Sequence, residues 1–117
     1  MPILTKRIYD PSEPADGHRL LTMRLWPRGV RKERVDAWER GLSPTHELLA
    51  DYRSNVIDWP EYERRYLHEL ATCSDSIAAL GALRQRAAHE PVTVMCGCKD
   101  ETRCHRTLLK TLLEGTP

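Results

Sequence analysis

The stretch VTVMCGCKDETRCHR, residues 92–106, joins a short β-branched run to three of the chain's four cysteines. Its first five residues, VTVMC, are typical of a strand that is buried on both faces. A loop over residues 97–102 follows. The sequence RCHRTLLKTLLEG then predicts a closing helix that begins near Thr102 and ends at Gly115. A buried strand joined by a short loop to an amphipathic helix indicates the α/β class.

Two further strands are predicted upstream, PILTKRIY (2–9) and HRLLTMRLW (18–26). The segment between them, DPSEPADGH, is rich in turn residues and shorter than a parallel crossover usually needs, so we expect an antiparallel pair. Helices are predicted over 31–41, 43–54, 60–73 and 76–90, from apolar spacing and from Pro and Gly at their ends. The expected architecture is a single compact α/β domain over residues 1–117, with a small mixed sheet of about three strands flanked by several helices.

The composition is that of an ordinary globular domain, with 117 residues of which 40% are hydrophobic and 30% charged. Such a chain can fold without disulfides or a structural metal. The sequence has no apolar run long enough for a membrane helix and no leader-like start, so we expect a cytoplasmic protein without membrane association. Cysteines in that compartment are thiols or metal ligands, and the isolated Cys73 is expected to be a small buried side chain.

The net charge of +1 argues against a general nucleic-acid binder, but the charges are unevenly placed. Residues 1–34 carry eight Lys and Arg against four Asp and Glu, whereas residues 35–90 carry six against ten. The basic first third, with Trp26 beside Arg24, leaves a nucleic-acid-binding module as an alternative function.

The loop after VTVMC is the first candidate site, because ligands of open α/β sheets bind beyond the carboxyl ends of the strands. Cys104 and His105 fall in the first turn of the predicted helix, on the side that faces the sheet, where a helix N-terminus favours thiolates and anions. Cys104 is therefore a candidate nucleophile and His105 a candidate proton carrier. Arg106 lies at the margin of that face, and Arg103 points to solvent.

Other interpretations of this corner remain open. Cys96, Cys98, Cys104 and His105 are the ligand types of a zinc site, although adjacent Cys and His on one helical turn are expected to diverge. A haem group, with Cys or His as axial ligand and arginines for its propionates, is a further alternative. The same side chains would also serve simply to complete the core.

The stretch RLWPRGVRK, residues 24–32, is the second candidate site. It delivers Arg24 and Trp26 at the end of a strand, and the turn at Pro27–Gly29 is expected to aim Arg28 outward. Planar guanidinium donors suit phosphate or carboxylate groups. We expect Arg24, Trp26, Arg28 and Arg106 to bind a small anionic ligand, with the reaction class and the oligomeric state left open. The alternative is a surface turn with Trp26 in the core.

The segments RIYD, DGHRLLTMRLWPRGV, WPEYERRY, HEL and VTVMCGCKDETRCHR resemble the YeaO-like proteins of the domain of unknown function 488 family. The resemblance runs through nearly the whole chain and implies a compact α/β fold and a cytoplasmic setting, but no assigned reaction. The wider family often has Cys-His-Arg in the last loop, matched here by Cys104, His105 and Arg106. YeaO-like chains often lack cysteines there.

Overall fold

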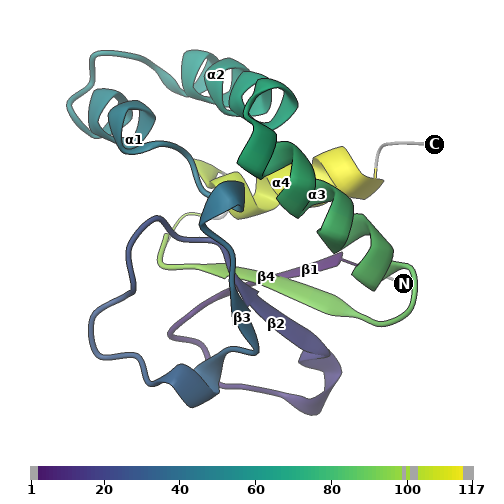
Figure 1. The fold of residues 1–117 in the computed structure, drawn as a ribbon. Helices are drawn as coiled ribbons and strands as arrows, with labels where there is room; N and C mark the ends of the chain where they lie inside the picture. The colour runs from purple at the N-terminus through teal and green to yellow at the C-terminus, as the bar shows by residue number, and fades with distance from the viewer. Residues whose placement is uncertain (1–2, 99, 101–102, 115–117) are drawn as a thin grey trace.

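In the part of the chain that the structure describes, the sheet has four strands, and every pair of neighbours is parallel. The computed structural model describes residues 3–98, 100 and 103–114. Within them the strands follow the order β1-β4-β2-β3 across the sheet (Figure 1). Their bounds are β1 Ile3–Arg7, β2 His18–Leu21, β3 Ala37–Trp38 and β4 Val92–Cys96. Because all strands run the same way, their carboxyl ends meet at one edge.

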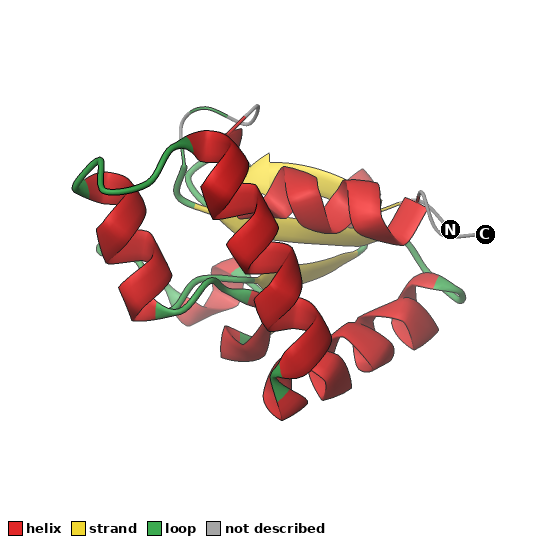
Figure 2. Ribbon diagram, turned by 90° about the horizontal axis from the view of Figure 1, so that it is seen from above, coloured by secondary structure: helices red, strands yellow, loops and turns green. Residues whose placement is uncertain are grey.

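The α-helices lie together on one side of the sheet (Figures 1 and 2). Their bounds are α1 His46–Arg53, α2 Trp59–Thr72, α3 Ser74–Ala87 and α4 His105–Glu114. Short 3-10 turns lie in the connections, among them η1 Pro14–Asp16, η2 Lys32–Arg34 and η3 Arg40–Leu42. The α/β class with helices flanking a small sheet is thus confirmed.

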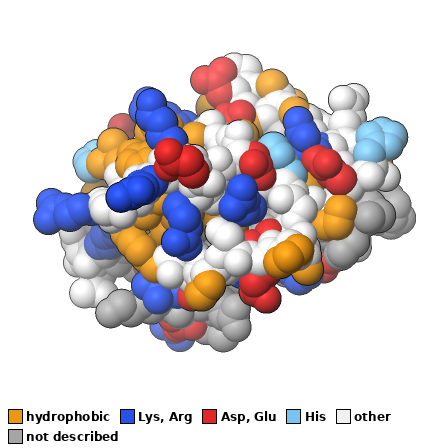
Figure 3. Space-filling view, turned by 90° about the horizontal axis from the view of Figure 1, so that it is seen from below, with side chains coloured by type: hydrophobic (Ala, Val, Ile, Leu, Met, Phe, Trp, Pro, Cys, Tyr) orange, Lys and Arg blue, Asp and Glu red, His pale blue; other side chains and the backbone are white. Residues whose placement is uncertain are grey.

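The sheet separates two apolar clusters because successive side chains of a strand point to opposite faces. On the helix side, Leu20 and Val94 join a core with buried residues of the helices, such as Tyr66 and Leu109. On the other side, Leu21 and Met95 pack with Ile8 and with apolar residues between 23 and 38. That second face is covered by loops, and Figure 3 shows Lys and Arg side chains gathered around hydrophobic ones over part of it. The prediction that residues 92–96 form a strand buried on both faces is confirmed.

Polar side chains fix where the helices begin. The Thr45 hydroxyl accepts a hydrogen bond from Leu48 N at the start of α1, and the Asp58 carboxylate accepts one from Glu61 N at the start of α2. In α2, which covers nearly the same residues as the helix predicted over 60–73, Tyr62, Tyr66 and Leu70 recur at helical spacing and are buried. The Tyr66 hydroxyl donates to the Leu42 carbonyl at 2.6 Å. These contacts hold α2 over the carboxyl end of the sheet.

The predicted antiparallel pairing of the first two strands was wrong. β1 and β2 do not pair with each other, since both pair in parallel with β4, which lies between them. The ten residues 8–17 must only return along a strand of four or five residues, and at about 3.3 Å per residue they reach far enough without a helix. Lys6 fastens this connection, because its Nζ donates to Pro11 O, Glu13 Oε1 and Asp16 Oδ1.

The helix predicted over 31–41 is replaced by η2, β3 and η3. Tertiary contacts outweigh helix propensity here. The Asp36 carboxylate accepts a hydrogen bond from Arg19 N at 2.8 Å, and the Trp38 indole donates to Met23 O at 2.8 Å. Both contacts pull the segment against β2 as a short edge strand.

Other boundaries also moved. The second strand ends at Leu21, and Leu25, expected on a strand face, has 72% of its surface exposed. Cys73 is exposed and not a buried core residue. The last helix begins at His105, whereas the expected start at Thr102 and end at Gly115 lie outside the described residues.

Candidate functional site

A cluster of three thiols and one imidazole lies at the carboxyl edge of the sheet. Cys96 ends β4, Cys98 follows it in the loop, and Cys104 and His105 stand at the start of α4. Their sulfur and nitrogen atoms all lie within 4.8 Å of one another. Cys96, Cys104 and His105 are buried, and Cys98 is partly exposed. These four residues were predicted from the sequence as one possible site, and the fold brings all four into one place.

The hydrogen bonds of His105 define its tautomer. Its Nε2 lies 2.6 Å from the Thr22 carbonyl oxygen, and a carbonyl only accepts, so Nε2 carries the hydrogen. The Thr22 hydroxyl, which donates to Met95 O at 3.0 Å, lies 3.3 Å from the same nitrogen. Burial lowers the pKa of His105 and keeps the ring neutral. Its Nδ1 lone pair therefore faces the thiols, 3.8 Å from Cys104 Sγ.

Arg106 lies beneath the cluster and is only 2% exposed. Its Nη1 lies 3.0 Å from Cys96 Sγ, 2.9 Å from the Cys98 carbonyl oxygen and 3.8 Å from Cys104 Sγ. Burial by itself would lower the pKa of Arg106, but the charge on Cys96 and the hydrogen bond to its sulfur raise it. The guanidinium is therefore a permanent positive charge against the sulfur atoms.

The contacts of Cys96 favour the negative charge of the cluster on that thiol. The hydrogen bond between Cys96 and Cys104, 2.8 Å between sulfurs, lowers the pKa of Cys96 far below its ordinary value, and Cys98 and Arg106 act in the same direction. The same bond raises the pKa of Cys104. For Cys98, the hydrogen bond to Cys104 lowers the pKa, but Cys96 and burial outweigh it and raise the value to about 11. Because His105 is neutral, the stabilising charge at neutral pH comes from Arg106.

A cavity of about 460 Å³ opens above this cluster. The residues that line it come from the segments after β1 and β2, from α1 and the residues before it, from the end of β4 and the loop after it, and from the start of α4: Tyr9, Met23, Arg24, Leu25, Trp26, Ser43, Pro44, His46, Leu49, Arg53, Cys96, Gly97, Cys98 and His105. Among the described residues this lining holds two arginines and two histidines but no Asp or Glu. We call it the edge pocket. Arg24 and Arg53 bring positive charge to its wall, and its floor is the sulfur cluster, where Arg106 lies against Cys96.

Arg24 is held in the wall of the edge pocket. Its Nε donates to the Pro44 carbonyl and its Nη2 to the Ser43 carbonyl, both at 3.2 Å. The predicted partner Arg28 does not line the pocket. It is exposed, and its carbonyl oxygen accepts a hydrogen bond from the Tyr9 hydroxyl at 3.2 Å.

Of the other predicted site residues, some line the edge pocket and others are buried under its lining. Trp26 lines the edge pocket, whereas Cys104 and Arg106 lie below its lining, in contact with Cys96. Arg103 is exposed, as expected. Sequence reasoning missed His46 and Arg53, the first and last residues of α1. The Ser-Pro-Thr that precedes His46 predicted a helix start there, but nothing in the sequence placed that start over the cysteines.

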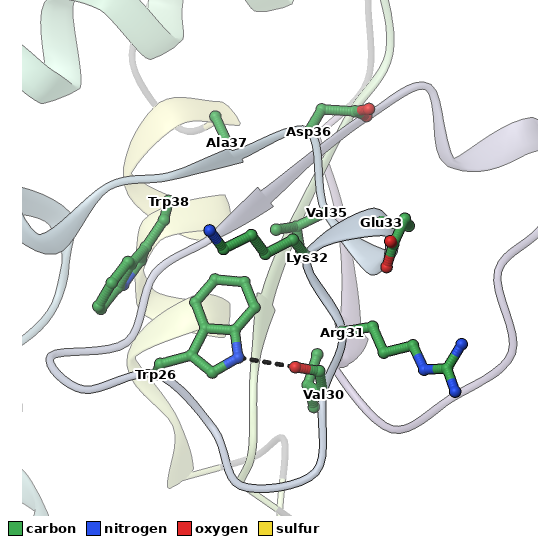
Figure 4. A pocket seen from close by; sticks show the side chains of 9 residues that line it. All are labelled: Trp26, Val30, Arg31, Lys32, Glu33, Val35, Asp36, Ala37 and Trp38. Carbon is green, nitrogen blue, oxygen red and sulfur yellow. Dashed lines mark hydrogen bonds between the residues drawn. The ribbon is translucent and has the colours of Figure 1, made fainter.

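A larger cavity, of about 930 Å³, lies beside β3 (Figure 4). Trp26 and Trp38 face it, and both indole N–H groups donate to backbone carbonyls, of Val30 and Met23. Its charged residues include both signs, Arg31 and Lys32 with Glu33 and Asp36. It has no thiol or imidazole in its lining, so we place the candidate site at the edge pocket and not here.

None of the helices in the described part of the chain is long and apolar enough to cross a membrane.

Comparison with known proteins places the chain in a family. It is 34% identical over 117 residues to the uncharacterized protein YeaO of Escherichia coli K12, covering 98% of this chain and 99% of that protein. It is 36% identical over 111 residues to the uncharacterized proteins Rv3073c of Mycobacterium tuberculosis H37Rv and Mb3100c of Mycobacterium bovis, covering 93% of this chain and 91% of each. No solved structure gives a significant match. The model of the family described as the active DUF488-N3 subclade matches residues 3–116, and the chain therefore belongs to the DUF488 family.

Proposed function

We propose that this protein binds a small anionic ligand, bearing a phosphate or carboxylate group, in the edge pocket. The observation that carries the proposal is the charge of the lining, which includes Arg24 and Arg53 and, among the described residues, no carboxylate. Electrostatic complementarity favours an anion in such a concave site. The pocket also lies at the carboxyl edge of a parallel sheet, where α/β proteins bind their ligands.

Arg24 is suited to hold the anion. Two of its five N–H groups donate to the Ser43 and Pro44 carbonyls, which orients the guanidinium plane. An arginine fixed in this way loses little side-chain freedom when it binds. Its other N–H groups offer paired donors to a phosphate or carboxylate.

The start of α1 adds positive potential to the same wall. Ser43, Pro44 and His46, just before and at the helix N-terminus, line the pocket. The backbone dipoles of a helix place a partial positive charge at that end. An anion beside Arg24 is therefore also favoured by α1.

The floor of the pocket supplies the chemistry available to a bound ligand. Cys98 is partly exposed there, and Cys96 lies beneath with the negative charge of the cluster. An anion held by Arg24 and Arg53 lies against sulfur and the His105 ring. Binding next to a thiol cluster is the arrangement that thiol-based catalysis on a small anionic substrate requires.

Binding of inorganic phosphate, small organic phosphates and dicarboxylates tests the proposal, with tryptophan fluorescence and calorimetry as readouts. Arg53→Gln and Arg24→Gln each remove a charged donor, worth about 1.5–3 kcal/mol, so affinity should fall roughly 10- to 100-fold. Arg64→Gln is the matched control, because Arg64 is exposed on α2 and pairs with Glu61. Absence of binding at millimolar concentrations, or equal affinity in all three variants, would refute the proposal.

A further inference from the structure

Three sulfur atoms and one imidazole nitrogen lie close together in the floor of the edge pocket, near enough to bind one metal ion. Anion binding makes no use of this arrangement. We infer that Cys96, Cys98, Cys104 and His105 bind one zinc ion. This inference does not depend on the proposed anionic ligand, since the metal would lie in the floor of the pocket and the ligand above it.

The chemistry of the donors fits zinc. Zn²⁺ in proteins takes four ligands in a tetrahedron, and a Cys3His set is common. With Zn–S distances of about 2.3 Å, neighbouring donors lie roughly 3.7 Å apart. The four atoms here lie within 4.8 Å, with 2.8 Å between Cys96 and Cys104 and 3.8 Å between Cys104 Sγ and His105 Nδ1. Movements of about 1 Å would bring all four to those tetrahedral separations.

The adjacency of Cys104 and His105 is compatible with shared coordination. Two neighbouring residues within a regular helical turn diverge, which was the sequence argument against zinc. In the structure α4 begins at His105, so Cys104 precedes the helix and is free of that geometry. The two side chains approach each other instead, at 3.8 Å.

His105 is already oriented as a metal ligand. Its Nε2–H donates to the Thr22 carbonyl, which leaves the lone pair on Nδ1 directed at the sulfurs. Metal-binding histidines in proteins almost always donate their second ring N–H in this way, to a carbonyl or carboxylate. Thr22 follows β2, so two strands and α4 together fix the site.

The position of Arg106 is explained by the charge of the complex. Zn²⁺ with three thiolates and a neutral imidazole carries a net charge of −1. A buried charge needs a counter-charge, and the buried guanidinium lies 3.0 Å from Cys96 Sγ. Its N–H also links that sulfur to the Cys98 carbonyl. Arg106 therefore balances the charge and donates to a ligand sulfur, the role that surrounding groups have in zinc–thiolate sites.

The test uses the full chain without a polyhistidine tag, purified in a reductant that does not bind metal. Elemental analysis should give about one zinc per chain. Replacement by Co²⁺ should give the intense visible bands of tetrahedral cobalt and a sulfur-to-cobalt charge-transfer band. Cys98→Ser is the informative variant, because its side chain is partly exposed and the fold should tolerate it. We expect it to weaken metal affinity by at least roughly 100-fold, above the 10- to 100-fold typical of groups around a site.

Cys73→Ser is the matched control, since Cys73 is an exposed cysteine at the start of α3. It should keep the zinc content and the cobalt spectrum, and circular dichroism should show the same fold in both variants. A chain that is isolated without zinc, binds no added Zn²⁺ and gives only octahedral cobalt bands would overturn the inference. So would equal zinc affinity in Cys98→Ser and Cys73→Ser. Arg53→Gln should leave zinc content unchanged while weakening phosphate binding, so failure of the metal site and failure of the anion site are distinguishable.

Discussion

The Lys6–Asp16 ion pair should make a large contribution to stability in a connection that has no α-helix. Asp16 has 6% of its side chain exposed, and Lys6 has 13%. Lys6 Nζ lies 2.8 Å from Asp16 Oδ1, and the second carboxylate oxygen accepts a hydrogen bond from Glu13 N at 2.9 Å. The pair therefore fastens residues 8–17, the connection that returns the chain from β1 to β2. Asp16→Asn removes the charge with little change in size.

The expected loss of unfolding free energy for Asp16→Asn is about 2 kcal/mol. Removing one partner of a fully buried pair costs about 3–5 kcal/mol. Lys6 keeps two other acceptors, Pro11 O at 2.9 Å and Glu13 Oε1 at 2.8 Å, so the loss should resemble that of one charged hydrogen bond, about 1.5–3 kcal/mol. For a chain of this length, 2 kcal/mol lowers the melting temperature by roughly 8 °C.

Glu13→Gln is the matched control, because Glu13 binds the same Lys6 at the same distance but has 65% of its side chain exposed. Exposed pairs contribute about 0.2–1 kcal/mol. Urea unfolding of both variants at neutral pH should therefore separate them by about 1 kcal/mol or more. Equal destabilisation would show that burial of Asp16 is not what makes the pair strong.

Acid should remove the difference between wild type and Asp16→Asn. Burial alone would raise the pKa of Asp16, but the hydrogen bonds from Lys6 and from Glu13 N hold it below its ordinary value. A carboxylate with a lowered folded pKa stabilises the protein above its unfolded pKa, and this is lost as pH falls through the folded value. The full difference in unfolding free energy between wild type and Asp16→Asn should be present at pH 7. It should be smaller near roughly pH 3, which is below the pKa of about 3.9 that an Asp has in the unfolded chain. A loss that does not shrink in acid would contradict the charge-based reasoning.

Three further changes have expected results. Tyr66→Phe removes a fully buried hydroxyl that donates to Leu42 O, so urea unfolding should show a loss of about 1–3 kcal/mol, and no loss would contradict that bond. Gly17→Ala should destabilise by roughly 2 kcal/mol or more in the same assay, because Gly17 has φ +64° and an added Cβ would overlap the Pro91 carbonyl; near-wild-type stability would contradict this backbone. Thiol labelling of the native chain should modify the exposed Cys73 rapidly and the two fully buried thiols only on unfolding, and Cys73→Ser should lose the rapid phase.

Those parts of the fold that depend on local pattern were predictable. The β-branched run at 92–96 forms a strand buried on both faces, and Tyr62, Tyr66 and Leu70 form the buried stripe of α2. Each of these apolar patterns lies within one strand or helix and indicates which side chains of that element are buried. The direction of β1 was not predictable in this way, because it depends on β4 entering between β1 and β2 from the far end of the sequence.

β3 shows why some elements escape pattern reasoning. Residues 31–41 have helix-forming composition, yet Trp38 donates to Met23 O and Asp36 accepts from Arg19 N. Both partners are distant in sequence. Neither contact produces a hydrophobic repeat that could be recognised in the sequence. Together they nevertheless determine that these residues form a two-residue strand.

The candidate site was predictable in its residue types but not in their roles. The Cys-His corner was named, and its four donor atoms do converge. The sequence favoured Cys104 as the charged thiol, since it was expected at a helix N-terminus. In the structure Arg106 contacts the Cys96 sulfur more closely, at 3.0 Å against 3.8 Å, so the charge is favoured on Cys96. Side-chain direction, which a sequence does not show, made that difference.

The order β1-β4-β2-β3 also has a consequence for biosynthesis. β1 and β2 are made first, but the strand that joins them is formed by residues 92–96, which are made about 70 residues after the end of β2. Until then both strands have unpaired edges toward the vacant centre, and the edge pocket lacks its floor. The sheet therefore closes only after residues 92–96 have been made, and a nascent chain stalled before residue 92 would present open strand edges to chaperones.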